Sequence, residues 1–245
     1  MLENSRSYRA FLNSPLSCRK YSTYVRAILW SFLQKRMKRW TRSGIAEFLE
    51  SHVCVNKQES VLIVGGYGPI LDYIKKIKFS NDIKTLDINR YHLPDYTCDI
   101  ADPFLVKKIK IKFNYVIMIE VLEHVHDYNM ALNNISKLLK NGGKLIATAP
   151  LISPLHDIPY DFHRFTFYEI ERMLKVSGLT NFKIESRGNY IDSILALGVR
   201  GFRGFTKSDK FVGILSILLT TFLPKPKVYD YPRFSSIGYN IVATH

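Results

Sequence analysis

The sequence SVLIVGGYGP occupies residues 60–69 and joins a short apolar run to a glycine-rich turn. A run of this kind, at 60–64, is typical of a strand that is buried on both faces of a sheet. Pro69 suits the first turn of a helix, so the pattern predicts a helix over Ile70–Lys78. The glycines allow the backbone to approach a bound ligand where a Cβ atom would collide. The stretch therefore predicts a strand–turn–helix unit with a ligand beside the turn.

Strands and helices continue to alternate beyond this unit. Six more strands are expected, at Lys84–Ile88, Asp95–Asp99, Asn114–Ile119, Lys144–Ala149, Asn181–Ser186 and Tyr239–Thr244. Asp127 can cap a helix that ends at the Asn-Gly-Gly of residues 141–143, and Thr166 with Glu169 forms a capping box for another. Such alternation implies parallel strands with right-handed crossovers. The expected fold is α/β: a doubly wound, mostly parallel, seven-stranded Rossmann-like sheet with an N-terminal helical segment and a helical insertion before the last strand.

Positive charge is distributed unevenly along the chain. The 245 residues carry a formal net charge of +14, of which residues 1–44 contribute +9 and residues 190–245 contribute +4. A nearly neutral centre with basic flanks indicates an anionic partner, either a membrane surface or nucleic acid. We expect three parts: a basic N-terminal helical segment (1–58), a central ligand-binding domain (59–189 plus 238–245) and an insertion (190–237).

Two stretches combine basic and apolar residues. A helix expected over Tyr21–Trp40 is apolar early and basic late, and the apolar Phe211–Leu223 follows Arg200, Arg203, Lys207 and Lys210. Neither reaches the roughly 20 apolar residues that cross a bilayer. The second stretch suits a membrane interface or a lid over the site, and it suits equally a helical hairpin that covers the sheet.

The N-terminal residues and the cysteines indicate the compartment. Arginines interrupt the first apolar residues, so we expect no cleaved secretory signal. Cys18, Cys54 and Cys98 show no paired spacing, which fits a reducing compartment and gives no sign of a thiol-ligated metal. We expect a cytoplasmic protein that lies peripherally at the inner face of the membrane.

The glycine turn and Asp87 together indicate a nucleoside ligand. Asp87 ends the second expected strand about 20 residues after the turn, where a carboxylate can bind both ribose hydroxyls. A dinucleotide site would carry a third glycine, and the spacing Gly66-x-Gly68-x-x-Leu71 has leucine in that place. The pair therefore favours a nucleoside cofactor other than a dinucleotide.

Acids after the third and fourth strands strengthen this interpretation. Asp99 and Ile100 can recognise adenine through a carboxylate and a backbone amide, and Glu120 leaves the fourth strand beneath the cofactor. The successive motifs VLIVGGYGP, TLDIN, CDIADPF, FNYVIMIEVLEHV, LLKNGGKLIATAP and GYNIVATH resemble those of class I S-adenosylmethionine (SAM) dependent methyltransferases. The likeness covers roughly residues 60–190 and the last strand. PLHDIPYDFHRFT (residues 154–166) is similar to a stretch in methyltransferases of bacterial polysaccharide and lipopolysaccharide gene clusters.

The resemblance implies SAM as the cofactor and gives each motif residue a role. Gly65, Gly66 and Gly68 would surround the methionine portion of SAM. Asp87 would bind the ribose, Asp99 and Ile100 would flank adenine, and Glu120 would lie near the sulfonium or the amino group.

Transfer to a hydroxyl group also requires a base. His156 and His124 are our candidates, because each follows a strand at the expected ligand edge. Alternatively, the loop after the fifth expected strand has a structural role, in which Asp161 and Arg164 form an ion pair that shapes it. The set His156, Asp157, Asp161 and His163 has metal-ligand residue types, but it contains no helical histidine pair, so we expect no metal.

These observations favour a SAM-dependent methyltransferase that O-methylates a glycan, a lipid-linked molecule or another small-molecule acceptor. An RNA methyltransferase is an alternative, although no module with interleaved aromatic and basic residues supports nucleic acid as partner. A non-catalytic scaffold is a second alternative, because Ile63 stands where the family usually has an acid and the glycine loop is one residue short.

Overall fold

The computed structural model describes residues 44–52, 58–76, 80, 82–201, 207–223, 227–230 and 235–245. The helix expected over Tyr21–Trp40 and most of the basic N-terminal segment lie outside these residues. The short helix α3 (Ile45–His52) is the first described element.

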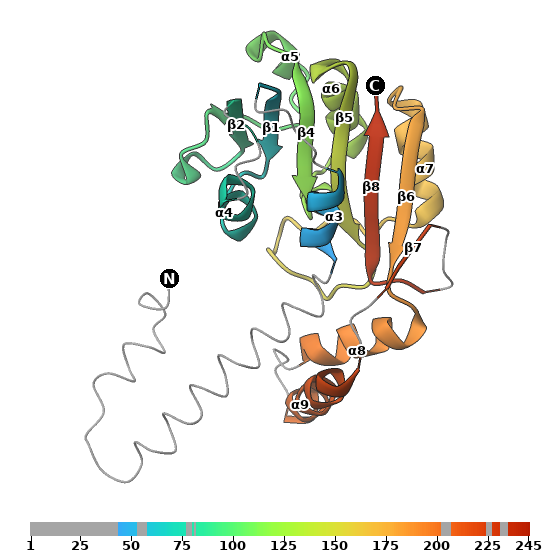
Figure 1. Cartoon of the computed structure of the whole chain (residues 1–245). Helices are drawn as coiled ribbons and strands as arrows, with labels where there is room; N and C mark the ends of the chain where they lie inside the picture. The colour runs from blue at the N-terminus through green and yellow to red at the C-terminus, as the bar shows by residue number, and fades with distance from the viewer. Residues whose placement is uncertain are drawn as a thin grey trace, which may run out of the picture.

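A single mixed sheet forms the centre of the described part of the chain (Figure 1). Its eight strands follow the order β3-β2-β1-β4-β5-β8-β6-β7. They are β1 (Ser60–Val64), β2 (Asp82–Asp87), β3 (Tyr96–Thr97), β4 (Phe113–Ile119), β5 (Leu139–Pro150), β6 (Asn181–Arg187), β7 (Val228–Tyr229) and β8 (Gly238–Thr244). The pairs from β3 to β5 are parallel, whereas β8 and β7 pair antiparallel with their neighbours.

The expected doubly wound, mostly parallel α/β fold is therefore confirmed. The expected count of seven strands is corrected to eight, because the two-residue β7 lies inside the insertion and pairs with the end of β6. A strand of two residues carries no periodic pattern, so it leaves no signal in the sequence.

Helices cover both faces of the sheet, and β1 shows why. Leu62 and Val64 pack into one core cluster, whereas Val61 and Ile63 pack into the cluster that α3 and α4 (Pro69–Lys76) cover. Successive side chains of a strand point to opposite faces, so an uninterrupted apolar strand needs a layer on each side. The other covering helices are α5 (Leu105–Lys108), α6 (Tyr128–Leu138) and α7 (Phe167–Val176).

The helix after Asp127 ends earlier than expected. Asp127 caps α6 through its side chain, which accepts a hydrogen bond from the Met130 amide, but the helix ends at Leu138 and not at residues 141–143. Leu139 is already extended, buried and paired with β4. The amide of Gly142, at a φ of +75°, donates to the carbonyl of His245. These glycines therefore shape the start of β5 and do not cap α6.

The insertion is helical, as expected. Its described helices are α8 (Tyr190–Gly201) and α9 (Lys207–Phe222), which pack against each other beyond the end of the sheet at which β4 ends (Figure 1). None of the helices in the described ranges combines the length and the apolar character that a membrane span requires.

Candidate cofactor and catalytic site

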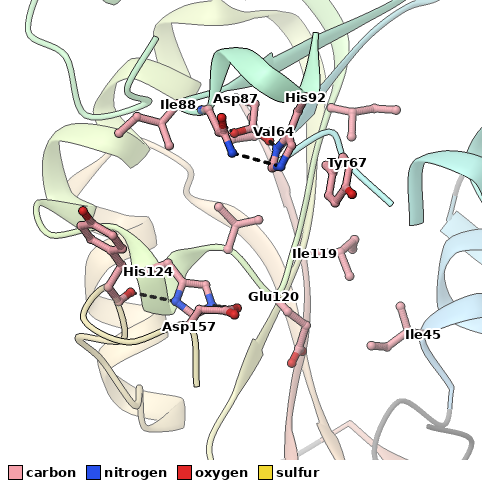
Figure 2. A pocket seen from close by; sticks show the side chains of 15 residues that line it. Ile45, Val64, Tyr67, Asp87, Ile88, His92, Ile119, Glu120, His124 and Asp157 are labelled. Atoms are coloured by element: carbon pink, nitrogen blue, oxygen red, sulfur yellow. Dashed lines mark hydrogen bonds and ion pairs between the residues drawn. The ribbon is translucent and has the colours of Figure 1, made fainter. Parts of the chain in front are cut away.

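A cavity of about 800 Å³ opens at the carboxyl ends of β1, β2 and β4. The strand order reverses between β1 and β4, which is where open α/β sheets bind their ligands. Figure 2 shows Asp87, His92 and Tyr67 on one side of this cavity and His124 and Asp157 on the other. Its volume lies within the range of pockets that hold cofactor-sized molecules.

The glycine turn forms one wall of the cavity through Gly65. This residue has a φ of +66°, and a Cβ atom on it would lie 2.7 Å from Cγ2 of Val121. A Cβ atom on Gly66 would lie 2.9 Å from Cβ of Thr85. Gly68 also has a positive φ, of +73°. Of the three glycines, Gly65 is the one among the residues that line the cavity, and contact of Gly66 and Gly68 with SAM stays a prediction.

The Asp87 carboxylate is buried at the end of β2 and is held by two donors. Its Oδ1 accepts from the Asn89 amide at 2.8 Å, and its Oδ2 lies 2.9 Å from Nδ1 of His92. The ring of Tyr67 stacks on His92 with centroids 3.7 Å apart. Each carboxylate oxygen has two lone pairs, so both can still accept from a ribose hydroxyl.

Sequence reasoning missed the neighbours of Asp87. Tyr67, His92 and Ile88 line the cavity, and the Ile88 side chain is 71% exposed there. Ile88 could have been identified from its position directly after Asp87, the acid that ends the strand. An apolar side chain at that place offers a surface for the flat ring of a nucleobase. No comparable local signal predicts the stacking of Tyr67 on His92.

Glu120 lines the cavity from the end of β4, in the left-handed backbone region at a φ of +54°. Its Oε1 accepts from Nη2 of Arg187 at 2.8 Å and from the Thr148 hydroxyl at 3.0 Å. Arg187 is buried at the end of β6, 67 residues along the chain. Sequence reasoning missed this partner, because nothing in the local sequence connects the two strands.

Asp99 and Ile100 lie outside the residues that line the cavity. Oδ1 of Asp99 accepts from the Ala101 amide at 2.8 Å, and Ile100 is buried with its carbonyl accepting from Asn134. Their contact with adenine stays a prediction.

Both candidate bases lie next to a carboxylate that the sequence analysis left out. Nε2 of His124 lies 3.8 Å and Nε2 of His156 lies 3.9 Å from Oε1 of Glu123, whose side chain is fully buried. We call these three residues the His–Glu cluster. Burial, followed by the negative charge of Glu120, raises the pKa of Glu123 well above its ordinary value. His124 lines the cavity, whereas His156 is not among the residues that line it.

Asp161 and Arg164 form the ion pair considered above, and it shapes the loop after β5. Nη1 and Nη2 of Arg164 donate to the two Asp161 oxygens at 2.6 and 2.7 Å. The hydrogen bond from Arg164, with a second from the His156 amide, holds the pKa of Asp161 far below its ordinary value. His163 lies apart from the cluster, with Nε2 near the His126 carbonyl. The four residues considered as metal ligands therefore do not form one site.

Comparison with known proteins identifies the class. A family model described as a methyltransferase domain matches residues 30–184, well over half of the chain. The chain belongs to this methyltransferase family. Uncharacterized protein L16 of Acanthamoeba polyphaga mimivirus is 24% identical over 110 residues, which are 41% of this chain and 39% of that protein. The chain thus matches about two fifths of the length of that curated relative.

Solved structures of SAM-dependent methyltransferases share the fold. One from Archaeoglobus fulgidus is 16% identical, with a TM-score of 0.54 over 88% of this chain and 100% of that one. A possible histamine N-methyltransferase of Thermotoga maritima is 14% identical, with a TM-score of 0.52 over 92% and 96% of the two chains. Phosphoethanolamine N-methyltransferase 2 of Haemonchus contortus, solved with SAM, is 13% identical, with a TM-score of 0.50 over 82% and 52%.

SAM is therefore the cofactor, as expected, and the residues present fit it. The cavity joins a glycine wall, where a side chain at residue 65 would be strained and would press on Val121, to a buried carboxylate at Asp87. The exposed Ile88 adds an apolar surface beside that carboxylate. A nucleoside can place its ribose at the carboxylate and its flat base on this apolar surface.

Proposed function

We propose that the protein transfers the methyl group of SAM to a hydroxyl oxygen of a glycan or lipid-linked acceptor. The observation that carries this proposal is the cavity itself. It brings Gly65 and Asp87, which suit the cofactor, together with His124, which belongs to the His–Glu cluster. A cofactor subsite and a proton-accepting cluster therefore share one cavity.

When bound, SAM supplies a methyl group on a positively charged sulfur, which is already an activated electrophile. The chain has three tasks. Asp87 orients the nucleoside, Glu120 presents a carboxylate that Arg187 and Thr148 hold in place, and His124 of the His–Glu cluster accepts the proton of the acceptor hydroxyl. Correct alignment of two reactants supplies about 7–11 kcal/mol in favourable cases, so most of the catalysis is positioning.

The α8–α9 hairpin supports an acceptor at a membrane surface. Exposed apolar side chains occupy much of α9: Phe211, Val212, Ile214, Leu215, Leu218, Leu219 and Phe222. The sequence also places Arg200, Arg203, Lys207 and Lys210 along this insertion. Apolar side chains beside basic ones are typical of helices that lie in an anionic membrane interface. We propose that this hairpin docks on such a surface.

The test is a methylation assay with labelled SAM, comparing a bacterial lipid-linked glycan extract with total RNA. We expect label in the glycan fraction and none in RNA. His124→Ala should lower the rate about 10²–10⁴-fold while SAM still binds. Label in RNA alone would favour the RNA alternative. SAM binding without label in either fraction would contradict the enzymatic proposal and leave the scaffold.

A further inference from the structure

The His–Glu cluster contains a buried carboxylate without a hydrogen-bonding neighbour. The Glu123 side chain has no exposed surface, and neither Oε1 nor Oε2 accepts a hydrogen bond from any other residue in the described ranges. Buried carboxylates are almost always hydrogen-bonded, paired with a cation or bound to a metal. Glu123 therefore lacks a partner that its burial requires.

Both histidines turn an unprotonated nitrogen toward this carboxylate. Nδ1 of His124 lies 2.8 Å from the carbonyl oxygen of Tyr160, which can only accept, so this nitrogen carries the hydrogen. Nδ1 of His156 lies 3.2 Å from the Pro154 carbonyl and 3.3 Å from Oδ2 of Asp161. In the neutral rings Nε2 is then the bare nitrogen, and both Nε2 atoms face Oε1 of Glu123.

Three side chains with electron-pair donor atoms thus converge on one point. The ligand atoms of the cluster all lie within 4.8 Å of one another. Asp161, itself held by Arg164, supports the ring of His156 in the way that outer carboxylates support metal-bound histidines. We propose that Glu123, His124 and His156 bind one divalent transition-metal ion.

The donor set selects the class of ion. Two imidazoles and one carboxylate with positions left open suit Zn²⁺, Mn²⁺ or Fe²⁺, whereas Mg²⁺ and Ca²⁺ favour oxygen donors alone. Donors bonded at about 2.0–2.2 Å to a tetrahedral ion lie roughly 3.4 Å apart. The distances of 3.8 and 3.9 Å from Oε1 to the two nitrogens need only a small closure.

The coordination positions of the ion that the three residues leave open would face the acceptor. This consequence rests on the proposed function. His124 and Asp157 line the cavity, and Oδ2 of Asp157 lies 3.8 Å from Nε2 of His124. A metal at this place can bind the acceptor oxygen and lower the pKa of its hydroxyl. His124 and His156 would then act as ligands, which replaces the role of base given to His124 under the proposed function, and the hydroxyl proton would pass to the Asp157 carboxylate beside the ion.

The experiment measures metal binding without SAM or acceptor. The full chain is treated with a chelator and titrated separately with Zn²⁺, Mn²⁺ and Co²⁺ by calorimetry, and the visible spectrum of Co²⁺ is recorded. We expect one saturable site, a higher melting temperature with metal, and Co²⁺ bands of a site with nitrogen ligands. Because failure of methylation leaves these readouts unchanged, the metal site and the proposed function are tested separately.

Two variants and a control decide the assignment. Loss of a partner that only orients a ligand costs about 10–100-fold in metal affinity, so Glu123→Gln and His156→Ala should each cost at least about 100-fold. His163→Ala, outside the cluster, should bind as the wild type does. Without metal, Glu123→Gln should melt no lower than wild type, since it replaces a buried carboxyl that makes no hydrogen bond with a neutral side chain of the same shape. Absence of binding for all three ions, or unchanged affinity in both variants, would overturn the proposal.

Discussion

Asp87 is the residue on which cofactor binding depends most directly. The chain itself orients its carboxylate, because the Asn89 amide and the His92 ring each hold one oxygen. Because these two donors already hold the carboxylate in place, a ligand that binds Asp87 does not have to order this side chain. Binding therefore costs little side-chain entropy at this residue.

Replacement of Asp87 should remove this anchor. Saturating SAM should raise the melting temperature of the wild type, since about 2.7 kcal/mol of stabilisation follows at a ligand concentration 100 times Kd. Asp87→Ala removes hydrogen bonds to a charged group, worth about 1.5–3 kcal/mol, so Kd should rise roughly 10–100-fold and the melting shift should shrink accordingly. Differential scanning fluorimetry with and without SAM measures this melting shift.

Asp72→Ala serves as the matched control, because Asp72 is an exposed carboxylate on α4 that does not line the cavity. It should keep the full SAM-dependent shift. Equal shifts in both variants would remove Asp87 from the cofactor site.

Residues such as Asp87 and Gly65 could be predicted because their roles follow from local spacing along a strand and its turn. Arg187 and Glu123 could not. Arg187 reaches Glu120 from a strand 67 residues away, and Glu123 next to His124 looks like an ordinary surface acid until the loop after β5 covers it. Burial of a charged side chain depends on packing, which short-range patterns do not encode.

At the scale of elements, α7 shows how local chemistry fixes a helix. Thr166 accepts from the Glu169 amide, which is one half of the expected capping box, and Nε and Nη2 of Arg172 donate to the Glu169 carboxylate at 2.8 and 2.7 Å. Tyr128 of α6 donates to the same carboxylate at 2.9 Å, so Glu169 also joins two helices.

This carboxylate should make stability depend on pH. The hydrogen bonds from Arg172 and then Tyr128 lower the pKa of Glu169 from 4.5 to about 2. Its contribution is therefore full above pH 4.5 and is lost as the pH falls through about 2. Glu169→Gln should lower the free energy of unfolding by about 0.3–1 kcal/mol at pH 7, and by less at acidic pH, in urea titrations.

Glu171→Gln on the same helix controls for the change from glutamate to glutamine, since Glu171 pairs only with the exposed Lys175 in the contacts described. A Glu169→Gln effect that is the same at neutral and acidic pH would contradict the prediction.

Elements marked by a continuous apolar run or by a helix-capping signal were predicted best. The strands β1 and β4 and the helix α7 match their expected segments, whereas the end of α6 was wrong. The Asn-Gly-Gly of residues 141–143 is a typical helix-ending sequence, but the pairing of Leu139 with β4 starts strand β5 before it. A tertiary pairing thus overrode a local helix-ending signal.

At the scale of the whole molecule, the α8–α9 hairpin and the carboxyl end of β4 lie at the same end of the sheet (Figure 1). The cavity opens at that end as well. Docking of the hairpin on a membrane would therefore bring the cavity close to an acceptor held there.

Vesicle binding tests this orientation. Leu215 and Leu218 are 48% and 52% exposed on α9, so Leu215→Glu with Leu218→Glu should leave the fold intact. Each exposed leucine buried in a membrane contributes about 1.5–3 kcal/mol, so the double variant should bind phosphatidylglycerol-containing vesicles at least about 100-fold more weakly in sedimentation assays.

Tyr168→Glu, at a position on α7 that is 69% exposed, should bind as the wild type does. Wild-type protein that stays in solution with such vesicles, or a double variant that sediments with them unchanged, would contradict the membrane proposal.

The sequence by itself determined the class of fold, the cofactor and the position of Asp87, because strand–turn–helix units are encoded within short stretches whose spacing can be read directly. Only the tertiary structure decided which distant residues meet. It placed Arg187 against Glu120, brought His156 to His124 over the buried Glu123, and set the hairpin at the end where the cavity opens. These contacts depend on how separate segments pack, and that packing is a property of the whole chain.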